Sequence, residues 1–231
     1  MAVHSYRGKA YCIIGFFCFI LHFASGQDQR LADSLVLELN SGIHQDDELN
    51  ILAQIAAEET NPERQLEFAE LLISKASINQ SHVFLHQGYL QKGNALKYIG
   101  NNVDALNAYF KSLDFANRNK DEKGIGSLMI SIAGTYTAMG NSNNAQDYFN
   151  KGILVLRKVN DSIKVATALL NAGDDYINAS RLDSALIYTT EAVDIFEKIN
   201  YPIGQAYGMG NLGMIYAERG KDVLAERNIN G

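Results

Sequence analysis

The chain of 231 residues has little cysteine, little proline and no tryptophan, and the first two shortages narrow how it can fold. Its two cysteines, Cys12 and Cys18, both lie within the first 26 residues, so no disulfide framework can stabilise the remainder of the chain. Proline occurs only at Pro62 and Pro202, which leaves long segments able to form uninterrupted helices. The sequence therefore has to fold around an apolar core, and it is long enough for one continuous core.

Basic clusters and long apolar runs are also scarce. The chain carries 20 Lys and Arg against 26 Asp and Glu, a formal net charge of −6. An acidic chain without a basic cluster is poorly suited to nucleic acid or to an anionic membrane surface, so we expect neither as a partner. After the first 26 residues no stretch is apolar enough to span a membrane, which predicts no direct membrane insertion of the mature residues.

The first 26 residues have the pattern of a secretory signal peptide. Arg7 and Lys9 precede an apolar run over 11–23, and three small residues then offer a cleavage site before Gln27. An uncleaved membrane anchor is the alternative, but the run is shorter than the roughly 20 residues of a spanning helix. The pattern predicts export to the periplasm or the extracellular space, with a mature chain that begins near Gln27.

Residues of the same kind recur at intervals of forty along the chain. A unit of this size that cannot bury its own apolar face stacks on its neighbours, which predicts a solenoid. The four columns are Gly93, Ala133, Gly173 and Gly213; Leu96, Tyr136, Tyr176 and Tyr216; Gly100, Gly140, Ser180 and Gly220; and Ala105, Ala145, Ala185 and Ala225.

Each unit has the pattern of a helical hairpin. In the unit 161–200, apolar residues recur at three- and four-residue steps in two runs separated at 179–181, as in two amphipathic helices. We expect Asn200-Tyr201-Pro202 to end this unit, because proline cannot continue a helix. The expected helices are 28–40, a weaker pair within 46–80, then 81–98, 102–118, 122–139, 142–159, 162–179, 182–199, 202–219 and a partial helix from 222.

The columns have explanations in packing. A mid-helix glycine such as Gly93 or Gly173 costs about 1 kcal/mol relative to alanine, and is tolerated where helices pack closely. The alanine column sits early in the second helix, where a small side chain lets it cross the first, and we expect the leucine and tyrosine column to supply the bulky partner. Gly100, Gly140 and Gly220 fit the left-handed conformation that ends a helix.

The order of the columns resembles the tetratricopeptide repeat, in which Gly-x-x-Tyr-x-x-x-Gly is followed by alanine and then by an aromatic residue. One copy is Gly93–Leu96–Gly100–Ala105–Tyr109. The resemblance implies an all-α fold, a right-handed α-solenoid of tandem helical hairpins. The forty-residue period is longer than the family's usual 34 residues and is similar to that of kinesin light chains and bacterial regulators. The implied divisions are a helix or linker over 27–45 and a solenoid over 46–231, with repeats at about 46–80, 81–120, 121–160, 161–200 and an incomplete 201–231.

With a leader in front, the arrangement resembles the exported sensory regions of bacterial membrane-bound histidine kinases or nucleotide cyclases. This implies a periplasmic protein- or peptide-binding scaffold for signal transduction, without an active site of its own, within a longer product. A free-standing secreted or periplasmic adaptor is the alternative, and an enzyme with an unrecognised site is a third hypothesis. The incomplete last repeat leaves its apolar stripe partly covered, which predicts that it frays or self-associates through its open end.

In this family the first helix of each pair lines the binding face, and the resemblance carries that role to matching positions here. Asn171 and Asn211 are forty residues apart, and an asparagine amide can both donate to and accept from an extended peptide backbone. The lysine with which some relatives hold a C-terminal carboxylate is absent from its column, so we do not expect a chaperone-tail adaptor. The candidate binding residues are Asn94, Lys97, Tyr98, Asn171, Asp174, Asn178, Tyr207 and Asn211, with Gln87, Ser131, Thr137 and Glu218 in the same row.

The sequence offers no grouping for chemistry. His82 and His86 share a helix face, but no third ligand is placed nearby, so we predict two exposed or rim histidines rather than a metal site. The stretch 208–213 matches the dinucleotide fingerprint G-x-G-x-x-G, yet it lies inside a repeat helix rather than after a strand. Asp174 and Asp175 are paired acids without a base or metal partner. We therefore predict no catalytic residue, no metal and no cofactor.

Overall fold

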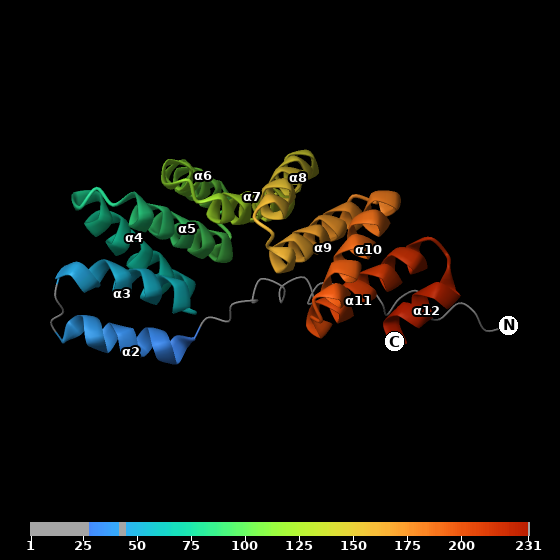
Figure 1. Ribbon diagram of the computed structural model, residues 1–231, viewed down its shortest axis with the longest axis horizontal. Coiled ribbons are helices and arrows are strands. Elements are labelled where there is room, and N and C mark those ends of the chain that lie inside the picture. Colours follow the sequence, from blue (N-terminus) through green and yellow to red (C-terminus); the bar gives the residue numbers. More distant parts are fainter. Residues whose placement is uncertain (1–27, 42–44, 231) are drawn as a thin grey trace.

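The computed structural model describes residues 28–41 and 45–230, and every regular element in these residues is a helix. Consecutive helices run antiparallel and stack into an arch (Figure 1), which confirms the predicted all-α helical repeat solenoid. The predicted signal peptide, 1–26, lies outside the described residues. The helices are α2 (Gln29–Asn40), α3 (Gln45–Glu58), α4 (Pro62–Ile78), α5 (His82–Ile99), α6 (Asn102–Asn119), α7 (Glu122–Ala138), α8 (Ser142–Lys158), α9 (Ser162–Asn178), α10 (Leu182–Lys198), α11 (Pro202–Glu218) and α12 (Asp222–Asn230).

A residue in the left-handed conformation follows each helix from α4 to α11, at intervals of twenty residues. The next N–H then donates to the carbonyl oxygen five residues earlier, as Asn101 does to Leu96 at 2.9 Å, which completes a Schellman motif. The backbone therefore repeats every twenty residues although the sequence repeats every forty. The left-handed residues are Gln80, Gly100, Lys120, Gly140, Asn160, Ser180, Asn200 and Gly220.

Pro202 does not end the unit 161–200, which corrects that prediction. α10 already ends at Lys198, and Asn200 takes the left-handed conformation with φ 52°. Asparagine tolerates this region better than most residues because its short polar side chain bonds locally. Pro202 instead begins α11, a position where its missing N–H removes no hydrogen bond.

Asparagine or aspartate starts several helices directly after the left-handed residue. Asn101, Asp121, Asn141 and Asp161 each accept a hydrogen bond from the backbone N–H three residues on. In α7 this bond runs from the Gly124 N–H to the Asp121 carboxylate at 2.9 Å. Two residues therefore suffice to end one helix and cap the next.

The alanine column lies where the two helices of a hairpin cross, as predicted. Ala105, Ala145 and Ala185 are completely buried, so each crossing is set by a side chain of one carbon. The leucine and tyrosine column packs at the same crossing, since Leu96 and Ala105 share one buried cluster and Tyr176 and Ala185 another, and the glycine column has a bulky partner of its own. A Cβ added to Gly93 would lie 2.5 Å from the ring of Tyr109, sixteen residues on, because the returning helix brings that position opposite the glycine.

The odd-numbered helices lie on the inner side of the arch and the even-numbered helices on the outer side (Figure 1). Along the inner side α3 contacts α5, α7 contacts α9, and α9 contacts α11. Within the described residues, no helix combines the length and the apolar character needed to cross a bilayer.

Candidate functional site

Polar side chains connect successive helices on the inner side of the arch. Thr137 on α7 donates a hydrogen bond to Asp175 Oδ1 on α9 at 2.9 Å. Lys164 Nζ on α9 donates to Ser127 Oγ on α7 at 2.6 Å. These two polar contacts lie beside an apolar core that continues from one hairpin into the next.

Asp174 occupies the middle of the predicted binding row and is half-buried. Asn211 Nδ2 on α11 donates a hydrogen bond to Asp174 Oδ1, so two candidate residues are in direct contact. Burial raises the pKa of the Asp174 carboxyl to about 7, and the bond from Asn211 opposes this shift. Near neutral pH the carboxyl group therefore exists in both protonation states and can either accept or donate a hydrogen bond.

The sequence pattern pairs Asp175 with Asp174, but the two acids have different roles in the structure. Successive helical residues point about 100° apart, so the two acids face different neighbours. Asp175 is 1% exposed, and its Oδ1 accepts the bond from Thr137, while its Oδ2 has no hydrogen-bond partner among the described residues. Asp175 therefore belongs to the contact between α7 and α9.

Asn94 on α5 holds its own hairpin together. Its Oδ1 accepts a hydrogen bond from the Tyr109 hydroxyl on α6 at 2.8 Å, and its Nδ2 donates to Gln91 Oε1 at 2.9 Å. Burial raises the pKa of the Tyr109 hydroxyl, which keeps it protonated as the donor. Tyr109 was not a candidate site residue, and the column spacing alone gave no sign of this bond.

Lys97 and Tyr98 follow near the end of α5. Burial lowers the pKa of the half-buried Lys97 to about 8. Its Nζ extends to α7, where a Cβ added to Gly134 would lie 3.3 Å away. Tyr98 is 41% exposed, and partial burial raises the pKa of its hydroxyl. The Lys97 side chain therefore lies at the boundary between α5 and α7.

The remaining candidates lie on α9 and α11. Asn171 and Tyr207 are half-buried, and Asn178 is exposed. The eight candidate binding residues therefore lie on α5, α9 and α11, and Ser131 and Thr137 of the same row lie on α7 between them (Figure 1).

The histidine pair and the glycine-rich stretch both have packing roles. His86 is buried, which corrects the expectation that both histidines lie at the rim, because its face of α5 packs on α6. Its Nδ1 lies 2.9 Å from Ser112 Oγ and its Nε2 lies 3.7 Å from Asp121 Oδ2. In the part of the chain that the structure describes, no three potential metal ligands gather. The stretch 208–213 lies inside α11, where Gly208 packs against Val193, as its position in a repeat helix predicts.

Residues 124–198 match the family model described as tetratricopeptide repeat. This range begins within α7 and ends with α10, and so covers nearly all of two hairpins. No curated protein sequence matches the chain.

Solved structures with a similar fold come from several kinds of protein. A Rap protein complexed with competence and sporulation factor superimposes with a TM-score of 0.70 at 15% identity, over 85% of this chain and 55% of that one. A signal transduction ATPase with a tetratricopeptide repeat sensor from Pyrococcus horikoshii gives 0.68 at 14% identity, over 85% of this chain and 34% of that one. The repeats of a putative kinesin light chain from Podosopora anserina give 0.67 at 13% identity, over 82% and 94%. At these identities the similarity shows a shared fold, and this chain spans about half of the first protein and a third of the second.

Proposed function

We propose that the chain, a tetratricopeptide repeat protein by its family match and its fold, binds an extended protein segment along the inner side of the arch. The observation that carries this proposal is the contact between Asp174 and Asn211. It places a half-buried acid and an amide on adjacent inner helices, next to the second asparagine of the row, Asn171. The tetratricopeptide fold supports binding of a protein or peptide.

The spacing of the two asparagines suits an extended chain. Packed helices lie about 8–10 Å apart, so Asn171 on α9 and Asn211 on α11 stand about that far from each other. An extended peptide rises about 3.3 Å per residue, so about three of its residues span this distance. Each amide can bond one peptide group of the bound segment, and Asp174 between them can act as donor or acceptor.

The binding test uses residues 27–231 as bait against a periplasmic extract, followed by affinity measurement with the identified partner segment. The double variant Asn171→Ala with Asn211→Ala removes two amide contacts of about 1 kcal/mol each, so we expect Kd to rise about 10- to 30-fold. Circular dichroism should show nearly unchanged helicity. Asn143→Ala, an exposed asparagine on the outer helix α8, is the matched control and should bind as the wild type does. An unchanged Kd for the double variant would move the site away from α9 and α11.

The proposed setting is the periplasm, with the chain as the sensory part of a longer bacterial signalling protein of the histidine kinase or cyclase type. The leader pattern supports export, and the similarity to a signalling ATPase with a tetratricopeptide repeat sensor supports the sensory role. A free-standing periplasmic or secreted adaptor is the alternative. The reading frame after Gly231 separates them, because a sensor requires an apolar span of about 20 residues and a cytoplasmic domain.

Export is tested at the N-terminus of the protein isolated from its native compartment. Mass spectrometry should find Gln27, or its cyclised form, as the first residue. Intact Met1 in the membrane fraction would contradict cleavage of the leader.

A further inference from the structure

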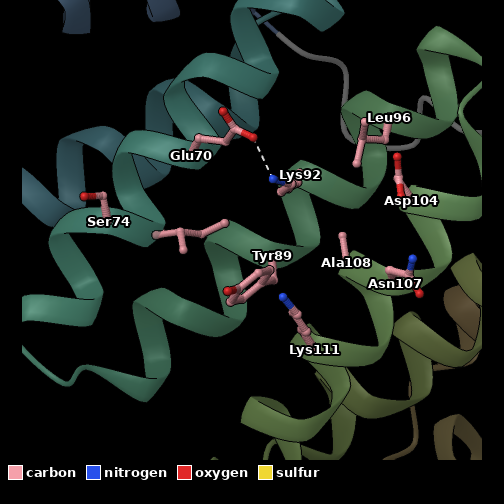
Figure 2. Close-up of a pocket in the computed structure, with 10 residues that line it drawn as sticks. Glu70, Ser74, Tyr89, Lys92, Leu96, Asp104, Asn107, Ala108 and Lys111 are labelled. Atoms are coloured by element: carbon pink, nitrogen blue, oxygen red, sulfur yellow. Dashed lines mark hydrogen bonds and ion pairs between the residues drawn. The ribbon is translucent and has the colours of Figure 1, made fainter.

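A hollow of about 640 Å³ lies on the outer side of the arch, between α4, α5 and α6 (Figure 2). Its base is apolar, because Leu96 and Ala108 line it and are 8% and 3% exposed. Glu70 and Lys92 stand at its rim and form an ion pair at 2.6 Å. A hollow of this size, with an apolar base and a few polar groups, is within the range of ligand-binding pockets.

The next two hairpins fill the corresponding place with a tyrosine of their own. Forty and eighty residues after Ala108 stand Tyr148 and Tyr188. The Tyr148 ring stacks on Tyr136 with 5.7 Å between centroids, and the Tyr188 ring tilts against Tyr176 at 5.1 Å. In the hairpin of α5 and α6 a leucine and an alanine replace these two rings, and the missing aromatic volume leaves the hollow.

The residue that accepts the tyrosine hydroxyl bond also has an equivalent at the hollow. The hydroxyl of Tyr188 donates a hydrogen bond to Asn150 Oδ1 on α8 at 2.6 Å. Eighty residues before Asn150 stands Glu70 on α4, whose carboxylate is an acceptor only. A phenol placed as Tyr188 is placed would therefore meet an acceptor at Glu70.

A lysine occupies the same repeat position in both hairpins, beside the Tyr148 ring in one and beside Tyr89, which also lines the hollow, in the other. Lys151 Nζ lies 5.2 Å from the centroid of the Tyr148 ring. Lys111, forty residues earlier, lines the hollow and lies 5.3 Å from the centroid of Tyr89. The hollow thus keeps the cation that accompanies an aromatic ring in the next hairpin.

We propose that this hollow binds a tyrosine side chain presented by a partner protein. The ring lies on Leu96 and Ala108, its hydroxyl donates to the Glu70 carboxylate, and Lys111 stands beside it. Within the chain, Tyr188 supplies the template for the hydroxyl contact and Tyr148 the template for the neighbouring lysine. The site is on the outer side of the arch, so it is separate from the inner face proposed above. Each of the two proposals can be tested without the other.

The test uses p-cresol, the tyrosine side chain without its backbone, with toluene as the matched control lacking the hydroxyl. In the folded wild type, p-cresol should shift the methyl NMR signals of Leu96 and Ala108 in a saturable manner. It should bind at least about 5-fold more tightly than toluene, as expected for one additional hydrogen bond. In Glu70→Ala this preference should disappear. Absent or unsaturable shifts in the wild type, or equal binding of toluene, would overturn the tyrosine site.

The variant Ala108→Tyr supplies the missing ring from within the chain. We expect it to abolish the p-cresol shifts and to raise Tm by about 2–4 °C, because the new ring fills the hollow and packs on Leu96. Unchanged p-cresol binding in folded Ala108→Tyr would place the ligand elsewhere. Should this variant not fold, the wild-type titration with its Glu70→Ala comparison still decides the proposal.

Discussion

The hairpins 81–120 and 161–200 have the same backbone but place a tyrosine one position apart in the repeat. Tyr109 stands one residue after the position that Tyr188 occupies, and one residue turns a helix by about 100°. Tyr109 is consequently buried between α5 and α6, against Gly93 and bonded to Asn94. Tyr188 instead lies on the outer side and reaches α8 of the preceding hairpin.

The tyrosine of a repeat can therefore join the two helices of its own hairpin or join its hairpin to the preceding one. In 81–120 the tyrosine joins the two helices of one unit and leaves the hollow between α4 and α6 unfilled. In 161–200 the junction between α8 and α10 is closed by Tyr188 and also by an ion pair from Arg157 to Glu191 at 2.6 Å. The position between the helices is then occupied by the smaller Thr189.

Tyr188→Ala should weaken the contact between α8 and α10, and we expect it to destabilise the protein more than any other variant discussed below. The variant removes a half-buried ring, its contact with Tyr176 and a hydrogen bond, which together stabilise by about 2–3 kcal/mol. Urea denaturation should show this loss in the free energy of unfolding. Tyr188→Phe keeps the ring and should cost only about 1 kcal/mol. Equal losses for both variants would mean that the ring itself contributes little.

The two glycines of the small column should respond differently to alanine. In Gly93→Ala the new Cβ would meet the Tyr109 ring, which is 1% exposed and held by Asn94, so overpacking of about 1–3 kcal/mol exceeds the gain of about 1 kcal/mol in helix propensity. In Gly173→Ala the new Cβ would meet Thr189 Oγ1, a single buried atom without a hydrogen-bond partner among the described residues, so its rotation to another rotamer would break no bond. We expect a net loss of about 1 kcal/mol for the first and almost none for the second, measured as urea midpoints. A larger loss for Gly173→Ala would contradict the comparison.

The repeated columns made the helices predictable from the sequence. All helix ends predicted between 81 and 219 agree with the structure to within one residue, because each rule of capping and termination appears in several copies. Residues that meet across a hairpin were less predictable. The partner of Gly93 and the left-handed Asn200 depend on how two helices cross and turn, which spacing along the chain does not encode.

The inner face was predictable as a row of polar residues, but not as a set of bonds. The sequence indicated Asp174 and Asn211 separately, and only the packing of α9 on α11 brings them together. The hollow was not predictable from the repeat columns, because these are defined by residues of the same kind. Ala108 stands in the same repeat position as Tyr148 and Tyr188 but is much smaller, and the space that this leaves is seen only in the three-dimensional structure.

The last prediction exchanges an acid for an amide, since Asn94 and Asp174 occupy the same column. Burial raises the pKa of Asp174 in the folded state to about 7, whereas an aspartate in an unfolded chain has a pKa of about 3.9. Between these values the folded state binds more protons than the unfolded state. The contribution of Asp174 therefore lowers the free energy of unfolding as the pH rises from about 4 to 7, and stays constant above that range.

Asp174→Asn removes this titration while keeping the size of the side chain and its contact with Asn211. The variant and the wild type should differ least near pH 4, and the variant should gain stability relative to the wild type as the pH approaches 8, as measured by urea midpoints. Asp194→Asn, at an exposed position on α10, is the control, and its urea midpoint should follow that of the wild type at every pH. A difference between Asp174→Asn and the wild type that stays constant with pH would mean that the Asp174 carboxyl remains hydrated. The inner face between α9 and α11 would then be more open to water than the contact between Asp174 and Asn211 indicates.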